Sequence, residues 1–105
     1  MGTDRELLEA AAKAAGIDWI KDCVWIENGF YSPIAKHERI SWNPLTDDGD
    51  ALRLAVKLKM GVNFDGEKVG ANCGRGAVEV FGNDPYAATR RAIVRAAAEI
   101  GRSMK

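Results

Sequence analysis

One segment near the middle of the chain, residues 47–60, has the periodicity of a helix but carries apolar side chains on two nearly opposite sides. At about 100° per residue, one stripe collects four residues: Ala51, Leu54, Ala55 and Leu58. A second stripe collects three more: Leu52, Val56 and Met60. One packing surface cannot bury both stripes. We therefore expect one stripe to pack on a sheet and the second, a candidate protein interface, to meet another helix or a second subunit.

A second constraint comes from residues 17–27, which are rich in β-branched and aromatic side chains and predict a strand. Its two faces are both apolar: Trp19, Cys23 and Trp25 on one, and Ile20, Val24 and Ile26 on the other. Such a strand needs a layer on each side. Asn28-Gly29 suits a two-residue turn and predicts a hairpin with strands over 19–27 and 30–32. Pro33 is expected to end that pairing, and 34–42 alternates weakly.

The remaining helices and strands are delimited by caps and glycines. Thr3 and Glu6 form a capping box that predicts a first helix over 4–15, ended by Gly16. The sequence Asn83-Asp84-Pro85 starts a last helix that is expected to reach Ile100 and to end at Gly101. Between the second and last helices, turn residues separate three short strands that form a meander: 62–64, 67–71 and 77–81.

The second helix begins at a cluster of carboxylates. Thr46 is the expected N-cap, and Asp47, Asp48 and Asp50 fall in the first turn, where the helix dipole favours negative charge. The same acids could bind a hard cation, but the segment lacks the spacing and the final glutamate of a calcium-binding loop. We therefore interpret them as capping residues and predict no metal site. The helix is expected to end at Gly61.

Length and composition limit the class of protein. The chain has 105 residues, and we expect one domain over 1–105 with frayed ends at 1–3 and 102–105. Hydrophobic residues make up 47% of it, which excludes disorder and collagen, and two cysteines are too few for a disulfide scaffold. No run of about 18 apolar residues occurs. These features predict a cytoplasmic protein with reduced cysteines and no membrane partner.

The elements together predict an α+β fold. We expect a single-domain α/β/α-type sandwich with a mainly antiparallel sheet of about four to five short strands and three helices. The expected order is helix, two strands, helix, three strands, helix. The doubly apolar first strand and the two-striped helix both suit layers on each side of the sheet.

Three stretches of the chain, residues 4–8, 42–50 and 84–92, resemble small phage and prophage proteins of the phage ABA sandwich domain family. They read Asp-Arg-Glu-Leu-Leu, Trp-Asn-Pro-Leu-Thr-Asp-Asp-Gly-Asp and Asp-Pro-Tyr-Ala-Ala-Thr-Arg-Arg-Ala, and they span most of the chain. The resemblance implies one sheet between helical layers and a viral or prophage origin. It implies no activity, since its motifs are caps and packing positions.

Other candidates for chemistry are isolated. His37 has only Glu38 beside it, and catalysis or metal binding needs converging groups. Gly70, Gly74 and Gly76 are not followed by the Gly-Lys-Ser/Thr sequence of a phosphate-binding loop. We therefore predict no catalytic residue and no cofactor, and an enzyme ranks third among the possible functions.

The last helix offers a basic stripe. Arg91, Arg95 and Arg102 share one side and could contact nucleic-acid phosphates. Residues 51–105 hold 10 basic and 5 acidic side chains, against 5 basic and 10 acidic in residues 1–50. Packing of the two halves is expected to neutralise this asymmetry, and a solvated face with an Arg95–Glu99 pair is the preferred interpretation because no aromatic residues interleave.

Arg90 is the exception on this helix. It lies beside Tyr86 and Val94, in the arc expected to face the core, so its donors need partners. We predict a structural arginine that ties the last helix to residues 42–50 through a backbone carbonyl or a carboxylate, such as that of Asp47 or Asp48.

The predicted function is non-catalytic protein binding. The expected partner is a host or phage protein, or a second copy of the chain, which would meet Leu52, Val56 and Met60. The alternative is a nucleic-acid-binding module that uses the arginines of the last helix.

Overall fold

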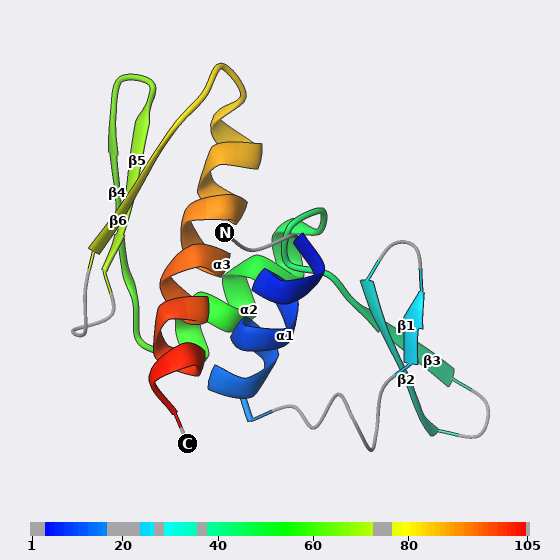
Figure 1. The fold of residues 1–105 in the computed structure, drawn as a ribbon. Helices are drawn as coiled ribbons and strands as arrows, with labels where there is room; N and C mark the ends of the chain where they lie inside the picture. The colour runs from blue at the N-terminus through cyan, green and yellow to red at the C-terminus, as the bar shows by residue number, and fades with distance from the viewer. Residues whose placement is uncertain (1–3, 17–23, 27–28, 36–37, 73–76, 105) are drawn as a thin grey trace.

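The computed structural model describes residues 4–16, 24–26, 29–35, 38–72 and 77–104, and over 24–42 it describes the backbone only. These residues form three helices and two antiparallel sheets of three strands each (Figure 1). The helices are α1 (Asp4–Ala14), α2 (Asp48–Lys57) and α3 (Pro85–Ser103). The first sheet contains β1 (Val24–Ile26), β2 (Gly29–Ala35) and β3 (Glu38–Trp42). The second sheet contains β4 (Gly61–Asp65), β5 (Lys68–Asn72) and β6 (Ala77–Phe81).

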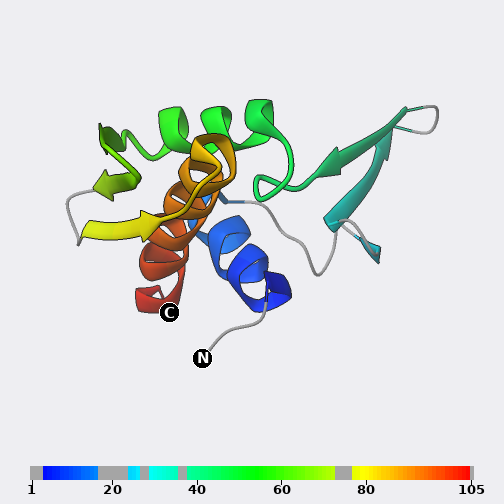
Figure 2. The same ribbon diagram turned by 90° about the horizontal axis from the view of Figure 1, so that it is seen from above.

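The α+β class and the three helices agree with the sequence analysis. The expected single sheet of about four to five strands is not confirmed, because the described strands fall into two sheets that lie on opposite sides of the helices (Figures 1 and 2). The weakly alternating segment supplies the additional strand β3. The element order is therefore helix, three strands, helix, three strands, helix.

The second sheet is covered on one face by α3. Its covered face presents Val69, Ala71 and Val80, which are buried against alanines of α3. Its other face presents mostly polar residues beside the exposed Phe81, and Lys68 lies 3.3 Å from Glu79 there. A sheet with one apolar and one polar face needs only one layer. The expectation of helices on both faces is thus wrong for this sheet.

The helices are assembled around α3, which packs against α1, α2 and the second sheet (Figure 2). The core between the three helices is rich in small residues, so the helix axes approach closely. Its buried members from α1 and the residue following it are Leu7, Leu8, Ala11, Ala12 and Ala15. Those from α2 are Ala51, Leu54 and Ala55, and those from α3 are Ile93, Val94, Ala97 and Ala98.

Gly101 does not end the last helix, contrary to the expected limit at Ile100. It is buried in the last turns of α3, which continues through Arg102 to Ser103. A Cβ atom at this position would overlap the backbone carbonyl of Ala10. The glycine is therefore needed for the close approach of α1 and α3. Arg102 and Ser103, which the sequence analysis placed in a frayed end, are the last residues of the helix.

Gly101→Ala should lower the free energy of unfolding by about 1–3 kcal/mol, because α1 must move away to admit one methyl group. Gly82→Ala is the matched control. Its Cβ would meet only the Ala88 Cβ, at 3.8 Å, so its effect should stay within about 0.5 kcal/mol. Urea denaturation measures both variants, and equal stability of Gly101→Ala and wild type would contradict the close approach.

The limits of α2 differ from the expected 47–60. The N-cap is Asp47, not Thr46: the Asp50 N–H donates to the Asp47 carboxylate at 2.8 Å, whereas the Thr46 hydroxyl donates to the Asn43 carbonyl at 3.4 Å. The helix ends before Gly61 because Lys59 adopts a left-handed conformation, with φ of 55°. The Met60 N–H then donates to the Ala55 carbonyl at 2.9 Å, which closes the helix end.

Lys59→Gly should raise the free energy of unfolding by about 0.5–1 kcal/mol, since glycine adopts a positive φ without the steric cost of a Cβ. Lys57→Gly removes the same charge from a residue with helical geometry and should lower it by about 0.5–1 kcal/mol. Thermal and urea unfolding compare the two variants. Equal losses in both would show that Lys59 bears no conformational cost.

The first sheet alters two expectations about its hairpin. Ile26 pairs with Gly29, so Gly29 begins β2 and does not belong to the turn. Pro33 shifts the register between Ser32 and Ala35 but does not end β2, because Ala35 still pairs with Glu38.

Several expected features lie outside the described residues. They are the Thr3 cap, the strand start at 17–23 with Trp19, Ile20 and Cys23, His37, and the loop at 73–76 with Cys73. Among the described helices, none combines the length and the apolar content that crossing a membrane requires.

Candidate binding groove

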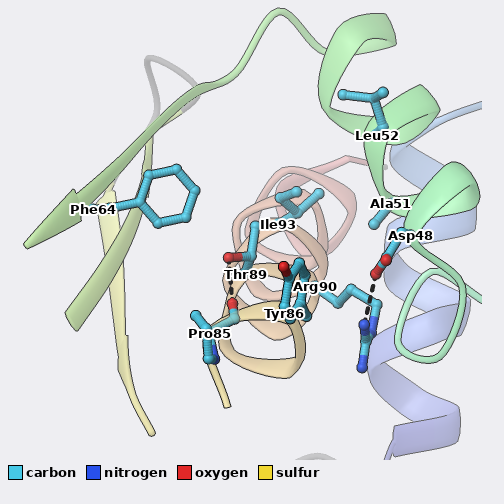
Figure 3. Close-up of a pocket in the computed structure, with 9 residues that line it drawn as sticks. All are labelled: Asp48, Ala51, Leu52, Phe64, Pro85, Tyr86, Thr89, Arg90 and Ile93. Carbon is cyan, nitrogen blue, oxygen red and sulfur yellow. Dashed lines mark hydrogen bonds and ion pairs between the residues drawn. The ribbon is translucent and has the colours of Figure 1, made fainter. Parts of the chain in front are cut away.

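A cavity of about 460 Å³ opens between α2 and β4, with α3 as its floor (Figure 3). Three elements supply its lining. From α2 come Asp48, Ala51 and Leu52, and from β4 comes Phe64. From α3 come Pro85, Tyr86, Thr89, Arg90 and Ile93. We call this cavity the groove.

Phe64 forms one wall of the groove. It lies two residues after Val62 in β4, so both side chains are on the same face of the strand. It also pairs with the buried Val69, and this face is therefore the covered face of the second sheet. Its side chain is nevertheless 65% exposed and points over the groove (Figure 3). The physical reason is that α3 packs mainly over β5 and β6, which leaves the covered face of β4 without a layer at its end.

The second stripe of α2 supplies the opposite wall. Leu52 and Val56, one turn apart, are 63% and 68% exposed, and Leu52 lines the groove. Met60 lies beyond the end of the helix and packs against the core. The structure therefore separates the three residues of the candidate interface: two are exposed on α2, and within the described part of the chain no other helix covers them. Ala51, Leu54 and Ala55 of the first stripe are buried, with Leu58 partly buried, but they pack in the helical core with α1 and α3 and not on a sheet as expected.

Arg90 holds the floor of the groove to the start of α2. Its Nε donates to the Leu45 carbonyl at 2.9 Å, and its Nη1 donates to the Asp48 carboxylate at 2.6 Å. Its side chain is 18% exposed. These contacts connect α3 with residues 42–50, which is the connection that the sequence analysis predicts for a structural arginine. Tyr86, expected in the same core-facing arc, is 68% exposed at the groove instead.

The clustered carboxylates each have a bond within the protein. Asp47 caps α2, and Asp48 pairs with Arg90. Asp50 is buried, and it accepts from the Asn43 N–H at 2.9 Å and from Arg53 at 2.7 Å. Across the described ranges, no group of three or more histidine, cysteine or acidic side chains is placed to hold a metal ion. Of the three carboxylates, therefore, only Asp47 acts as a cap, and Asp48 and Asp50 bind other parts of the protein.

The basic stripe of α3 is partly neutralised by neighbouring acids. Arg91 lies 3.2 Å from Asp4 of α1, and Arg102 lies 3.1 Å from Glu99. The expected Arg95–Glu99 pair is replaced by this Arg102–Glu99 pair. Arg95 is exposed, and it has no acidic partner among the residues that are described. The three arginines thus present less net positive charge than their spacing suggests.

The groove offers apolar surface more than reactive groups. The Thr89 hydroxyl donates to the Pro85 carbonyl at 2.5 Å, and Arg90 and Asp48 bind each other. A concave, mostly apolar site of this volume is typical of binding. Sequence reasoning did not select Phe64 for this site. The sequence shows that Phe64 shares a strand face with Val62, but the exposure of Phe64 depends on how far α3 extends over the sheet.

Comparisons with known proteins do not place the chain in a family: no family model, no curated protein and no solved structure matches it.

Arg90→Ala should lower the free energy of unfolding by about 2 kcal/mol, because the Leu45 carbonyl and the start of α2 lose their charged donor. Arg90→Lys should recover less than half of this loss, because an ammonium lacks the planar fork that reaches both acceptors. Arg95→Ala, on the same helix, is the control and should stay within about 0.5 kcal/mol of wild type. Urea unfolding of Arg90→Ala at the wild-type midpoint would show that the two bonds are dispensable.

Proposed function

We propose that the chain is a small phage or prophage accessory protein that acts as a non-catalytic protein-binding module, with the groove as its binding surface. The partner is a host or phage protein, or a second copy of the chain. The motifs at 4–8, 42–50 and 84–92 support the proposed origin. The groove supports binding as the mode of action.

The observation that carries the proposal is the exposure of Phe64 opposite Leu52. Both side chains are about two-thirds exposed, and between them lies a cavity with the buried Ile93 in its floor. An apolar patch that surrounds a concavity is unfavourable in water and marks an interaction site. Covering one such side chain contributes roughly 1.5–3 kcal/mol, so two or three of them support measurable affinity.

Nucleic-acid binding through Arg91, Arg95 and Arg102 is the alternative. The ion pairs of Arg91 and Arg102 with acidic side chains weigh against it. The two modes differ in their response to salt. Binding to phosphates weakens steeply as salt is added, whereas binding to an apolar surface does not.

A photoreactive amino acid at position 56, beside Leu52 on α2, tests the proposal in a lysate of the cells that naturally contain the chain. We expect a discrete adduct that persists as salt is raised and that Leu52→Glu reduces about tenfold, which corresponds to about 1.4 kcal/mol. Leu52→Glu should leave the melting temperature unchanged, since the side chain is exposed.

Position 79, on the polar face of the second sheet, is the control site for the photoreactive group. An adduct of twice the mass of the chain identifies a second copy as the partner. The same adducts from positions 56 and 79, or none from position 56, would count against the groove. An adduct that is lost on addition of salt and on charge reversal of the three arginines would favour the nucleic-acid alternative.

A further inference from the structure

We propose that the partner enters the groove as an extended peptide segment that adds to the free edge of β4 as a fourth strand of the second sheet. The segment carries apolar side chains at alternate positions and a lysine or arginine at the end that lies beside the β4–β5 turn. This inference rests on the proposed function and specifies the partner's form.

The free edge follows from the topology of the sheet. Its strand order is β4-β5-β6, so within the described ranges β4 has a neighbouring strand on one side only. Asp65 and Lys68 pair around a two-residue turn in which Gly66 has φ of 62°, and such a closing pair exchanges both of its hydrogen bonds. Hydrogen-bonded pairs alternate along an antiparallel ladder. Val62 and Phe64 therefore direct their N–H and C=O groups away from β5, toward the free edge.

Val62 and Phe64 thus offer both unpaired backbone groups and apolar side chains to an added strand. A strand added beside Val62 and Phe64 places every second side chain on the covered face of the sheet. At that position the covered face borders the groove, with Phe64 at one wall and Leu52 at the other (Figure 3). The backbone of the added strand would satisfy the free edge, and its apolar side chains would fill the cavity.

The exposed area favours a short segment over a second copy of the chain. An aromatic side chain buries roughly 150–250 Å² when covered, so Phe64 and Tyr86 with Leu52 and Val56 offer on the order of 400–500 Å². A stable interface needs about 800 Å² from each partner. A single strand also gains hydrogen bonds from the edge of β4, which supplement the limited apolar area.

Charge sets the expected polarity of the segment. Asp65 and Glu67 are exposed at the β4–β5 turn. The Gly82 N–H donates to the Glu67 carbonyl at 3.2 Å, which brings the Asp84 end of α3 to the same end of the groove. Lys68 is the nearby cation, and it lies 3.8 Å from Asp65 and closer to Glu79. Lys59, in contrast, is exposed beside the other end of β4. A basic residue of the partner therefore suits the turn end.

The test is a selection of binders to the 105-residue chain from a displayed library of random linear peptides of about ten residues. We expect recovered peptides with apolar residues at alternate positions and a basic residue at one end. Phe64→Glu should weaken the best synthetic peptide at least about tenfold. Phe81→Glu changes a phenylalanine of similar exposure on the opposite face of the same sheet and should leave affinity within about twofold.

Amide hydrogen exchange with the bound peptide separates strand addition from other binding modes. Exchange at the Val62 and Phe64 amides should slow at least about tenfold, whereas the Asn63 amide, bonded to β5, should be protected with and without peptide. A peptide that depends on Phe64 but protects neither amide, or that has helical spacing of its apolar residues, overturns strand addition and leaves the groove as a binding site. Absence of any peptide that Phe64→Glu weakens overturns strand addition, whereas the crosslinking from position 56 decides separately whether the groove binds a folded partner.

Discussion

The close crossing of α1 and α3 is the contact on which the rest of the structure depends. At this crossing the backbone of Ala10 lies where any side chain at position 101 would stand. Alanines on both helices keep the axes near each other, so a short chain obtains a dense core from small residues. Such a core tolerates larger side chains poorly, because alanine-rich helices have no long side chains that could rearrange to make room for an added methyl group.

With one side of α3 occupied by α1, its remaining sides accommodate α2 and the second sheet. The alanines Ala88, Ala92 and Ala96 face β5 and β6, and Arg90 reaches the start of α2. Near its N-terminal end, α3 therefore has neighbours that diverge from one another. The groove arises at this divergence, between α2 and β4 and above the buried Ile93.

Local sequence signals predicted the elements well and their assembly less well. Gly16 ended α1, and the strands 61–65, 68–72 and 77–81 lie within one residue of their expected positions. Lys59 and Gly101 were misleading because each acts against the usual preference of its residue type: a lysine takes the left-handed position, and a glycine serves packing inside a helix. The pairing of strands into two sheets depends on contacts between distant residues, which alternation along the chain does not encode. Periodicity identified the exposed Leu52 and Val56 on α2, of which Leu52 lines the groove, but the position of Phe64 depends on tertiary packing.

The two walls of the groove are consecutive in the chain. Only residues 58–60 separate the end of α2 from the start of β4, and the left-handed Lys59 sets the direction in which the chain leaves the helix. The floor, in contrast, belongs to α3, which packs against α1 and which Arg90 connects to the first turn of α2. The distance between the two walls therefore depends on the three-residue connector 58–60. A change in that connector would alter the width of the groove in a related chain while the helical core stays the same.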